Sequence, residues 1–306
     1  MIPVSAGSVN LIVNMLLALY NRVFEETDIP LLQHTFSFLK ENQLRVILFR
    51  DFYERLQPYI NFEEPPLLFQ SNKDLPPQTD FMISLGGDGT MLDTVSYIGN
   101  SGIPVIGINL GRLGFLADIP ENEMDSAWQG LLRGSYSIEK RSLIHLDSNV
   151  PLFGECPYAL NEFTLHRKDS SQMIKIHTYL NGEFLNTYFA DGLIVSTPTG
   201  STGYSLSCNG PVMFPQASVF VITPVAPHNL NIRPIVVPDD YVVSFELEGR
   251  TDQFLCTLDS RMEAITKDVQ LAVKKEDFEI SLVKLDEHNF LKTLRQKLYW
   301  GADNRH

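Results

Sequence analysis

The sequence lacks the cysteine patterns of disulfide-bonded and zinc-binding proteins. Its three cysteines, Cys156, Cys208 and Cys256, are odd in number, far apart and without C-x-x-C spacing. This spacing excludes a disulfide framework and indicates no structural zinc site. We therefore expect the chain to occupy a reducing cytoplasm.

Long apolar runs are also missing. The most apolar stretch near the start, 11–20, is interrupted by Asn14 and has no basic residue before it. It is much shorter than the ~20 apolar residues that span a bilayer. The sequence predicts neither membrane insertion nor an export signal.

Positive charge is scarce. The chain has 24 Lys and Arg against 37 Asp and Glu, which gives a net charge of −13. Nucleic acid is not expected as a partner, because such surfaces need clustered Lys and Arg. An enzyme of this charge that handles phosphates would need glycine loops and a divalent cation to hold anionic substrates.

The first half of the chain alternates short apolar runs with helical patterns. With 306 residues, of which 44% are hydrophobic and 20% charged, two globular domains are expected. Helical spacing follows Asp28, with Pro30 in the first turn, and recurs over 121–133. The pattern predicts an open, Rossmann-like α/β domain. Its expected buried strands are 15–20, 44–49, 81–85 and 104–108.

Beyond about residue 138 the pattern changes to period-two alternation, as in 174–180 and 241–248. A mostly β, sandwich-like domain is therefore expected. Asn181-Gly182 predicts a tight hairpin, because both central residues of a type I′ turn need positive φ. Residues 290–298 return to helical spacing, which indicates a segment that packs back on the first domain. The expected units are an N-terminal extension, 1–14, an α/β nucleotide-binding domain, 15–137 with 276–306, and a β-rich domain, 138–275.

A glycine turn, Gly86-Gly87-Asp88-Gly89-Thr90, joins an expected strand to a helix. Ligands of open α/β sheets bind at the carboxyl ends of strands, where helix N-termini attract phosphate. We therefore assign Gly86, Gly87, Gly89 and Thr90 to a nucleotide site. Asp88 would repel phosphate unless it held a metal or accepted a proton, so it is the catalytic candidate.

Other interpretations of this turn remain open. An N-capping Asp in a glycine turn occurs in many α/β proteins. The P-loop pattern is absent, and G-x-G-x-x-G fails because Leu92 stands at the third glycine position.

Five separated segments together resemble bacterial NAD kinases, over nearly the whole chain after Met15. They are GGDGT at 86–90, IGINLGRLGFL at 106–116, Asn161-Glu162, DGLIVSTPTGSTGYSLS at 191–207 and ITPVAPHNLNIRP at 222–234. The chain departs from the family where Gly203 replaces a usual Ala, where Cys208 begins a C-N-G-P segment, and where an Arg is missing near Tyr97.

The resemblance implies a role for each matching residue. Asp88 is expected to accept the proton of the attacking hydroxyl. Asn161 and Glu162 offer the donors and acceptors that a ribose diol needs, and Tyr204 offers an aromatic face for stacking. Each residue also has a structural alternative: Asn161 and Glu162 would cap a turn, Tyr204 would belong to the core, and Arg261 would be a surface residue. The expected NAD contacts are Asp88, Gly89, Asn161, Glu162, Asp191, Thr202, Gly203, Tyr204, Ser205, Leu206, Ser207 and Arg261, so 138–275 is the expected NAD-binding domain.

The resemblance implies an ATP-dependent NAD kinase that transfers the γ-phosphoryl group of ATP to the 2′-hydroxyl of the adenosine ribose of NAD. A divalent cation, Mg²⁺, is the expected cofactor, with its ligands unassigned, and a homo-oligomer, a tetramer or dimer, is the expected assembly. Two alternatives are a lipid kinase of the diacylglycerol or sphingosine type, which shares GGDG, and a non-catalytic NAD(P) sensor. The residues leave open the phosphoryl donor, ATP or polyphosphate, the use of NADH, and regulation.

Overall fold

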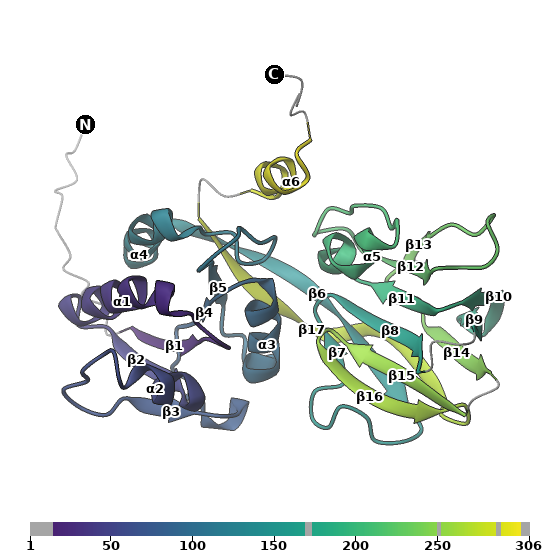
Figure 1. Ribbon diagram of the computed structural model, residues 1–306, viewed down its shortest axis with the longest axis horizontal. Coiled ribbons are helices and arrows are strands. Elements are labelled where there is room, and N and C mark those ends of the chain that lie inside the picture. Colours follow the sequence, from purple (N-terminus) through teal and green to yellow (C-terminus); the bar gives the residue numbers. More distant parts are fainter. Residues whose placement is uncertain (1–14, 169–172, 250–251, 286–288, 301–306) are drawn as a thin grey trace, which may run out of the picture.

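The computed structural model describes residues 15–168, 173–249, 252–285 and 289–300, and the expected extension 1–14 lies outside these residues. Figure 1 shows an α/β part built from the first half of the chain beside a β-rich part built from the second. None of the described helices is long and apolar enough to cross a membrane.

The α/β part is a parallel sheet in the order β5-β4-β1-β2-β3 with helices on both faces. Strands β1 and β4 are buried along their whole length, as the continuous apolar runs predicted. The strands are β1 (Leu16–Tyr20), β2 (Arg45–Phe49), β3 (Leu67–Phe69), β4 (Phe81–Leu85) and β5 (Val105–Ile108). The helices are α1 (Ile29–Glu41), α2 (Arg50–Leu56), α3 (Asp88–Ile98) and α4 (Met124–Arg133), with short 3-10 turns at Glu26–Asp28, Asn72–Asp74, Gly99–Ser101 and Glu121–Glu123.

Alternating side chains of the central strand divide the core of this part between its two faces. Leu17 and Leu19 pack in the cluster that includes residues of α1, α2 and α4. Leu16 and Ala18 pack in the cluster that includes residues of α3. Helix α3 therefore covers one face with the β-rich part beside it, and its first residue is Asp88 (Figure 1).

The β-rich part is a sandwich of two sheets. The six-stranded sheet has the order β13-β12-β11-β8-β15-β16, and the strands β10-β9-β14 extend the large sheet of the α/β part through β17. Phe163 of one sheet and Phe245 of the other lie 5.6 Å apart between ring centroids in the shared core. The elements are β6 (Tyr136–Ser148), β7 (Tyr158–Ala159), β8 (Glu162–Arg167), β9 (Ile174–Leu180), β10 (Glu183–Ala190), β11 (Gly192–Ser196), a 3-10 turn (Thr199–Thr202), α5 (Tyr204–Ser207), β12 (Val219–Val225), β13 (Ile235–Pro238), β14 (Val243–Glu248), β15 (Gln253–Leu258), β16 (Arg261–Thr266) and β17 (Leu271–Leu285). The predicted fold class is confirmed.

Two long antiparallel strands, β6 and β17, connect the parts. They pair along most of their length, with an irregularity between Lys275 and Glu279, and β17 also pairs with β5 in the α/β sheet. The change from one part to the other therefore falls inside continuous strands, and the predicted domain limits stay predictions. The last helix, α6 (Phe290–Leu298), touches both parts, since Lys297 donates to the Leu113 carbonyl and Phe290 contacts Phe214.

The hairpin prediction is confirmed. Asn181 and Gly182 join β9 to β10 with φ values of 49° and 83°, which the type I′ turn requires. The sequence did not predict the short elements α2 and β3. The strand expected over 241–248 begins two residues later in the structure, at Val243, so Tyr241 lies before β14.

Candidate active site

The order of the parallel strands places a ligand crevice beside the glycine turn. From β1 the chain proceeds outward to β2 and β3, and it then returns to add β4 and β5 on the other side of β1. The topological switch point therefore lies between the carboxyl ends of β1 and β4, where open α/β sheets bind ligands. The turn from Gly86 to Thr90 leaves the end of β4 at this point.

The glycines of the turn serve two purposes. Gly86 has φ +148°, and a Cβ at this position would lie 2.5 Å from the Thr90 hydroxyl. Gly86 therefore lets the chain turn tightly into α3. A Cβ on Gly87 or Gly89 would meet nothing within 4 Å, so the space beside them is open to a ligand.

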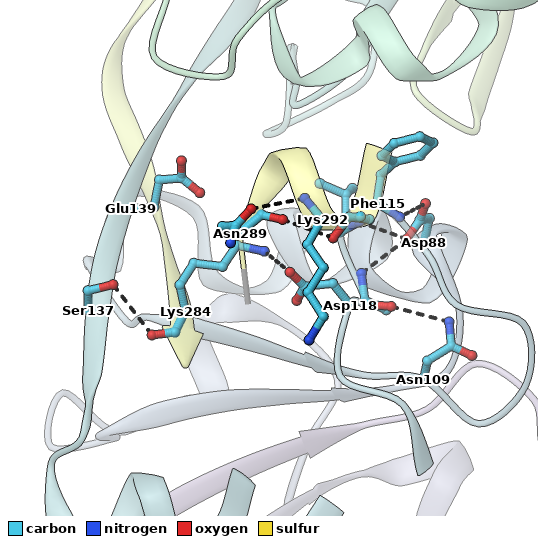
Figure 2. Close-up of polar contacts among 12 residues, drawn as sticks. Asp88, Asn109, Phe115, Asp118, Ser137, Glu139, Lys284, Asn289 and Lys292 are labelled. Carbon is cyan, nitrogen blue, oxygen red and sulfur yellow. Dashed lines mark hydrogen bonds and ion pairs between the residues drawn. The ribbon is translucent and has the colours of Figure 1, made fainter. Parts of the chain in front are cut away.

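Asp88 is held by backbone N–H groups of a second loop. Its Oδ1 accepts hydrogen bonds from the N–H groups of Leu116 (2.9 Å) and Ala117 (3.0 Å), and its Oδ2 accepts one from Phe115 (2.9 Å). Figure 2 shows these contacts converging on the carboxylate. A carboxylate has about four acceptor positions, two on each oxygen, so Oδ2 keeps one position for a substrate.

The loop that holds Asp88 follows β5 and is closed on itself. Gly114 N–H donates to the Ala117 carbonyl, and the Asn109 side chain donates to the same oxygen. A Cβ on Gly114 would lie 1.9 Å from Oδ1 of Asp88, so only glycine fits beside the carboxylate. The G-x-L-G-F-L segment therefore has a physical role that its sequence pattern did not reveal.

The other side of the switch point carries a cation that sequence reasoning missed. Asn21 is fully buried after β1, and its amide donates to the Leu85 carbonyl at the end of β4. The next residue, Arg22, is exposed, and its Nε lies 3.7 Å from the Asp93 carboxylate on α3. Only the strand order could identify it, because a lone Arg after a strand carries no motif.

Asn161 and Glu162 sit in a turn held by a third carboxylate. Asp259 accepts hydrogen bonds from the N–H groups of Leu160, Asn161 and Glu162 at 2.8 to 3.2 Å. The Oδ1 of Asn161 and the Oε2 of Glu162 are buried and have no hydrogen-bond partner in the structure. Buried polar atoms are normally paired, so these two oxygens indicate a place where a ligand donates hydrogen bonds.

Glu162 has an unusual electrostatic environment. Burial raises the pKa of its carboxyl to about 8, and the nearby negative charge of Asp259 acts in the same direction. The side chain is 8% exposed. A carboxyl group with this pKa is protonated at neutral pH until a ligand or a cation changes its surroundings.

The 199–204 turn packs directly on this pair. A Cβ on Gly200 would lie 2.2 Å from the Asn161 carbonyl oxygen, and one on Gly203 would lie 3.3 Å from Oε2 of Glu162 and 3.4 Å from the Asn161 amide nitrogen. The glycines therefore let the turn approach both residues. The Ala usual at the position of Gly203 would occupy space near the unpaired oxygen of Glu162.

The predicted residues of the 202–207 segment occupy different environments. Tyr204 is 38% exposed and stacks on His166 with ring centroids 5.7 Å apart. Ser205 is buried, and its hydroxyl shares a hydrogen bond with Thr223. Thr202 bonds within its own turn to the Thr199 carbonyl. Tyr204 and the exposed Ser207 are the accessible members, with Leu206 partly buried between them.

Two further predicted residues form contacts within the protein. The Asp191 carboxylate pairs with the Arg167 guanidinium at 2.9 Å. Arg261 donates to the carbonyls of Cys156 and Tyr158, and its guanidinium lies over the Phe153 ring. The geometry favours a structural role for Arg261, and its expected phosphate contact stays a prediction.

Asp93 links the two groups of site residues. It accepts a hydrogen bond from Tyr20, lies near Arg22, and is 3.5 Å from the Ser260 hydroxyl beside Asp259. Helix α3, which starts at Asp88, therefore contacts the turn that supports Asn161 and Glu162. The structure brings the glycine turn and the Asn161 turn to the same helix.

A cavity of about 860 Å³ lies between the two parts, on the far side of the loop that holds Asp88. Phe115 and Asp118 line it from the α/β part, Arg141 from β6, and Phe214 from the β-rich part. None of the predicted site residues lines this cavity. It adjoins them through Phe115, whose N–H binds Asp88, and through Arg141, which donates to Thr199.

Two family models and several relatives match the chain. The ATP-NAD kinase N-terminal domain matches residues 9–136, and the ATP-NAD kinase C-terminal domain matches residues 160–285. The NAD kinase of Cytophaga hutchinsonii is 49% identical over 95% of this chain and all of its own length, and that of Flavobacterium psychrophilum is 43% identical over the same shares.

Two solved structures have a similar fold. Yeast NADH kinase, in complex with NADH, covers 95% of this chain and 89% of its own with a TM-score of 0.85 and 23% identity. An NAD kinase from Archaeoglobus fulgidus, in complex with ATP, covers 93% of this chain and 99% of its own with a TM-score of 0.70 and 22% identity.

Proposed function

The chain belongs to the NAD kinase family and is an ATP-dependent kinase that acts on NAD, and we propose that Asp88 is the catalytic residue of this reaction. The observation that carries the proposal is the geometry of its carboxylate. Three backbone N–H groups fix it at the switch point, and Oδ2 keeps one free acceptor position.

Asp88 acts on the acceptor hydroxyl in this proposal. Oδ2 accepts a hydrogen bond from the 2′-hydroxyl of the adenosine ribose and takes its proton as the oxygen attacks the γ-phosphorus of ATP. The bond to the β,γ-bridging oxygen breaks, and ADP leaves. Because phosphoryl transfer depends mainly on positioning and charge neutralisation, a carboxylate that cannot rotate suits this role.

The triphosphate of ATP lies over the glycine turn. Helix α3 begins at Asp88, a Cβ on Gly87 or Gly89 would meet nothing within 4 Å, and helix N-termini attract phosphate. Arg22 supplies a positive charge from the opposite side of the switch point. It adds a positive charge near this site in a chain of net charge −13.

A divalent cation, Mg²⁺, completes the charge balance in this proposal. Among the described residues no three His, Cys, Asp or Glu side chains gather as a metal site. In nucleotide enzymes Mg²⁺ is commonly bound mainly by substrate phosphates, with few protein ligands. The free position of Asp88 is taken by the ribose hydroxyl, so phosphate oxygens would hold the ion, and it would neutralise phosphate charge.

NAD binds at the Asn161 turn. The unpaired oxygens of Asn161 and Glu162 accept hydrogen bonds from ribose hydroxyls, and the exposed ring of Tyr204 offers a stacking surface. The protonated carboxyl of Glu162 can also donate to a ligand oxygen.

We propose a cytoplasmic homo-oligomer, a dimer or tetramer. Strand β10 forms the outer edge of the large sheet and carries Phe184 and Phe189, which are 56% and 42% exposed. Exposed apolar side chains on an edge strand favour pairing with a second copy. The three cysteines are unpaired in the structure, which supports the proposed location. Sedimentation of the purified protein measures the assembly, and a monomer would contradict this proposal.

The experiment that tests the function supplies NAD, ATP and Mg²⁺ and measures NADP with an NADP-specific dehydrogenase. NADP must form with ATP and stop when the divalent cation is chelated. The same assay with polyphosphate or NADH defines the donor and acceptor. If NAD remains unphosphorylated with every donor, the proposed chemistry is wrong.

A further inference from the structure

The orientation of Asp88 depends on the loop that supplies its three hydrogen bonds. All three of its N–H donors belong to residues 115–117, so a shift of that loop turns the carboxylate. Part of the loop's position is set within the α/β part, because Leu116 is buried in a cluster with residues of α3 and Ile119 forms a bridge with Ile108 of β5. The C-terminal segment adds two further contacts, one on each side of the three N–H donors.

A buried ion pair fixes the residue that follows the loop. The Asp118 carboxylate lies 2.6 Å from Nζ of Lys284, the penultimate residue of β17, and the two side chains are 6% and 12% exposed. Figure 2 shows Lys284 reaching across to Asp118 beside the residues that hold Asp88. Strand β17 also spans the β-rich part, so the pair connects the loop to the longest strand of the molecule.

A second lysine of the C-terminal segment holds the other end of the loop. Nζ of Lys297 on α6 donates to the Leu113 carbonyl at 2.5 Å and lies 5.8 Å from the centroid of the Phe115 ring. The loop is therefore bound before and after the three N–H donors, in both cases by lysines that are far away in sequence.

Stability does not account for the ion pair. Desolvation of two buried charges offsets most of their attraction, so apolar residues of similar volume are commonly as stable. What the pair provides is one defined loop position, since the ammonium and the carboxylate must meet at hydrogen-bond distance.

We infer that Lys284 is a positioning residue for phosphoryl transfer, acting through Asp118 and the 115–117 loop on the orientation of Asp88. The inference rests on the proposed catalytic role of Asp88. A shift of about 1 Å at a reacting group is enough to lower a rate by about two orders of magnitude. Lys284 lies outside the proposed ATP and NAD sites, so we expect its loss to change turnover and to leave substrate binding unchanged.

The test replaces the pair by apolar residues of similar size, Lys284→Met with Asp118→Leu. We expect kcat to fall at least about tenfold, KM for NAD and ATP to stay within about twofold, and the midpoint of thermal unfolding to change little. The single variant Lys284→Arg keeps the charge and the contact with Asp118, so we expect it to retain most of the wild-type turnover.

The cavity wall offers a matched control. Lys275 and Asp239 form a more exposed ion pair at 2.8 Å on the same wall, with side chains 36% and 8% exposed, and neither belongs to the 115–117 loop. Lys275→Met with Asp239→Leu must leave kcat near the wild-type value. An equal fall of kcat in both double variants would overturn the inference, because it would indicate a general effect on the cavity.

Two further variants keep the outcomes separate. If the apolar pair does not fold, Asp118→Asn removes the negative charge and weakens the contact with Lys284, so it must lower kcat while KM stays near the wild-type value. Asp88→Asn is measured in parallel. Wild-type turnover in Asp88→Asn contradicts the proposed function, whereas loss in Asp88→Asn with wild-type turnover in the apolar double variant contradicts only the role of Lys284.

Discussion

Two aspartates of this enzyme use the same device for different purposes. Asp88 and Asp259 each accept three hydrogen bonds from consecutive backbone N–H groups. The loop holds the Asp88 carboxylate in place, and this carboxylate faces the site. The Asp259 carboxylate instead holds a turn in place, and this turn presents Asn161 and Glu162 to the site. A carboxylate that binds successive N–H groups can thus orient either itself or the chain around it.

The raised pKa of Glu162 predicts a pH dependence of stability. Its ordinary value is 4.5 and its value in the folded protein is about 8, so between these values the folded state binds a proton that the unfolded state releases. The free energy of unfolding therefore falls as pH rises from 4.5 to 8, by up to about 1.4 kcal/mol per pH unit.

Urea unfolding of the wild type and of Glu162→Gln between pH 5 and 8 checks this. The variant carries a neutral amide at every pH, so its stability must decline less steeply than that of the wild type. Parallel curves for the two proteins would show that the Glu162 carboxyl has an ordinary pKa.

At the scale of elements, the sequence predicted the parts that follow from periodicity and turn chemistry. The four longer strands of the α/β part, the β9–β10 hairpin and α6 all lie where apolar spacing placed them. The sequence did not predict the short elements α2 and β3, because their seven and three residues are too few to show a clear period.

The site was predictable only where residues sit within one motif. GGDG and the 199–207 turn could be identified from local sequence. Lys284 and Arg22 act through partners that lie tens to hundreds of residues away, so only the folded chain brings them to the site. Arg261 binds the backbone carbonyls of Cys156 and Tyr158, which its sequence position did not indicate, and its expected phosphate contact stays a prediction.

The loop after β5 gives a prediction of its own. Gly114→Ala places a Cβ where Oδ1 of Asp88 now lies, so the carboxylate must turn away, and we expect kcat to fall by at least about tenfold. Gly111→Ala is the control in the same loop, because a Cβ there meets only the Asn109 side chain at 4.0 Å. Steady-state kinetics of the two variants separate local crowding from a general effect of alanine. Equal turnover in both would contradict the described packing.

At the scale of the whole molecule, function follows from the order of the strands. The switch point puts the ends of β1 and β4 side by side, and the return of β17 from the β-rich part brings the C-terminal segment to the same region (Figure 1). The net charge of −13 makes each cation near the switch point important for binding phosphates.

Arg22 therefore provides a test of the switch point. We expect Arg22→Gln to raise KM for ATP by about tenfold and to leave KM for NAD nearly unchanged, since one charge-assisted contact to phosphate is lost. Stability should not change, because an exposed ion pair at 3.7 Å contributes little. Arg133→Gln at the end of α4 is the control for loss of one surface charge. An unchanged KM for ATP in Arg22→Gln would place the triphosphate elsewhere.

The central claim is that the fixed carboxylate of Asp88 takes the proton of the NAD ribose hydroxyl. The most direct measurement is the single-turnover rate of NADP formation by Asp88→Asn, with saturating NAD, ATP and Mg²⁺. The amide keeps the size of the side chain but cannot accept the proton, so we predict a rate at least about a hundredfold below that of the wild type, with little change in NAD affinity. A rate near that of the wild type would contradict the account.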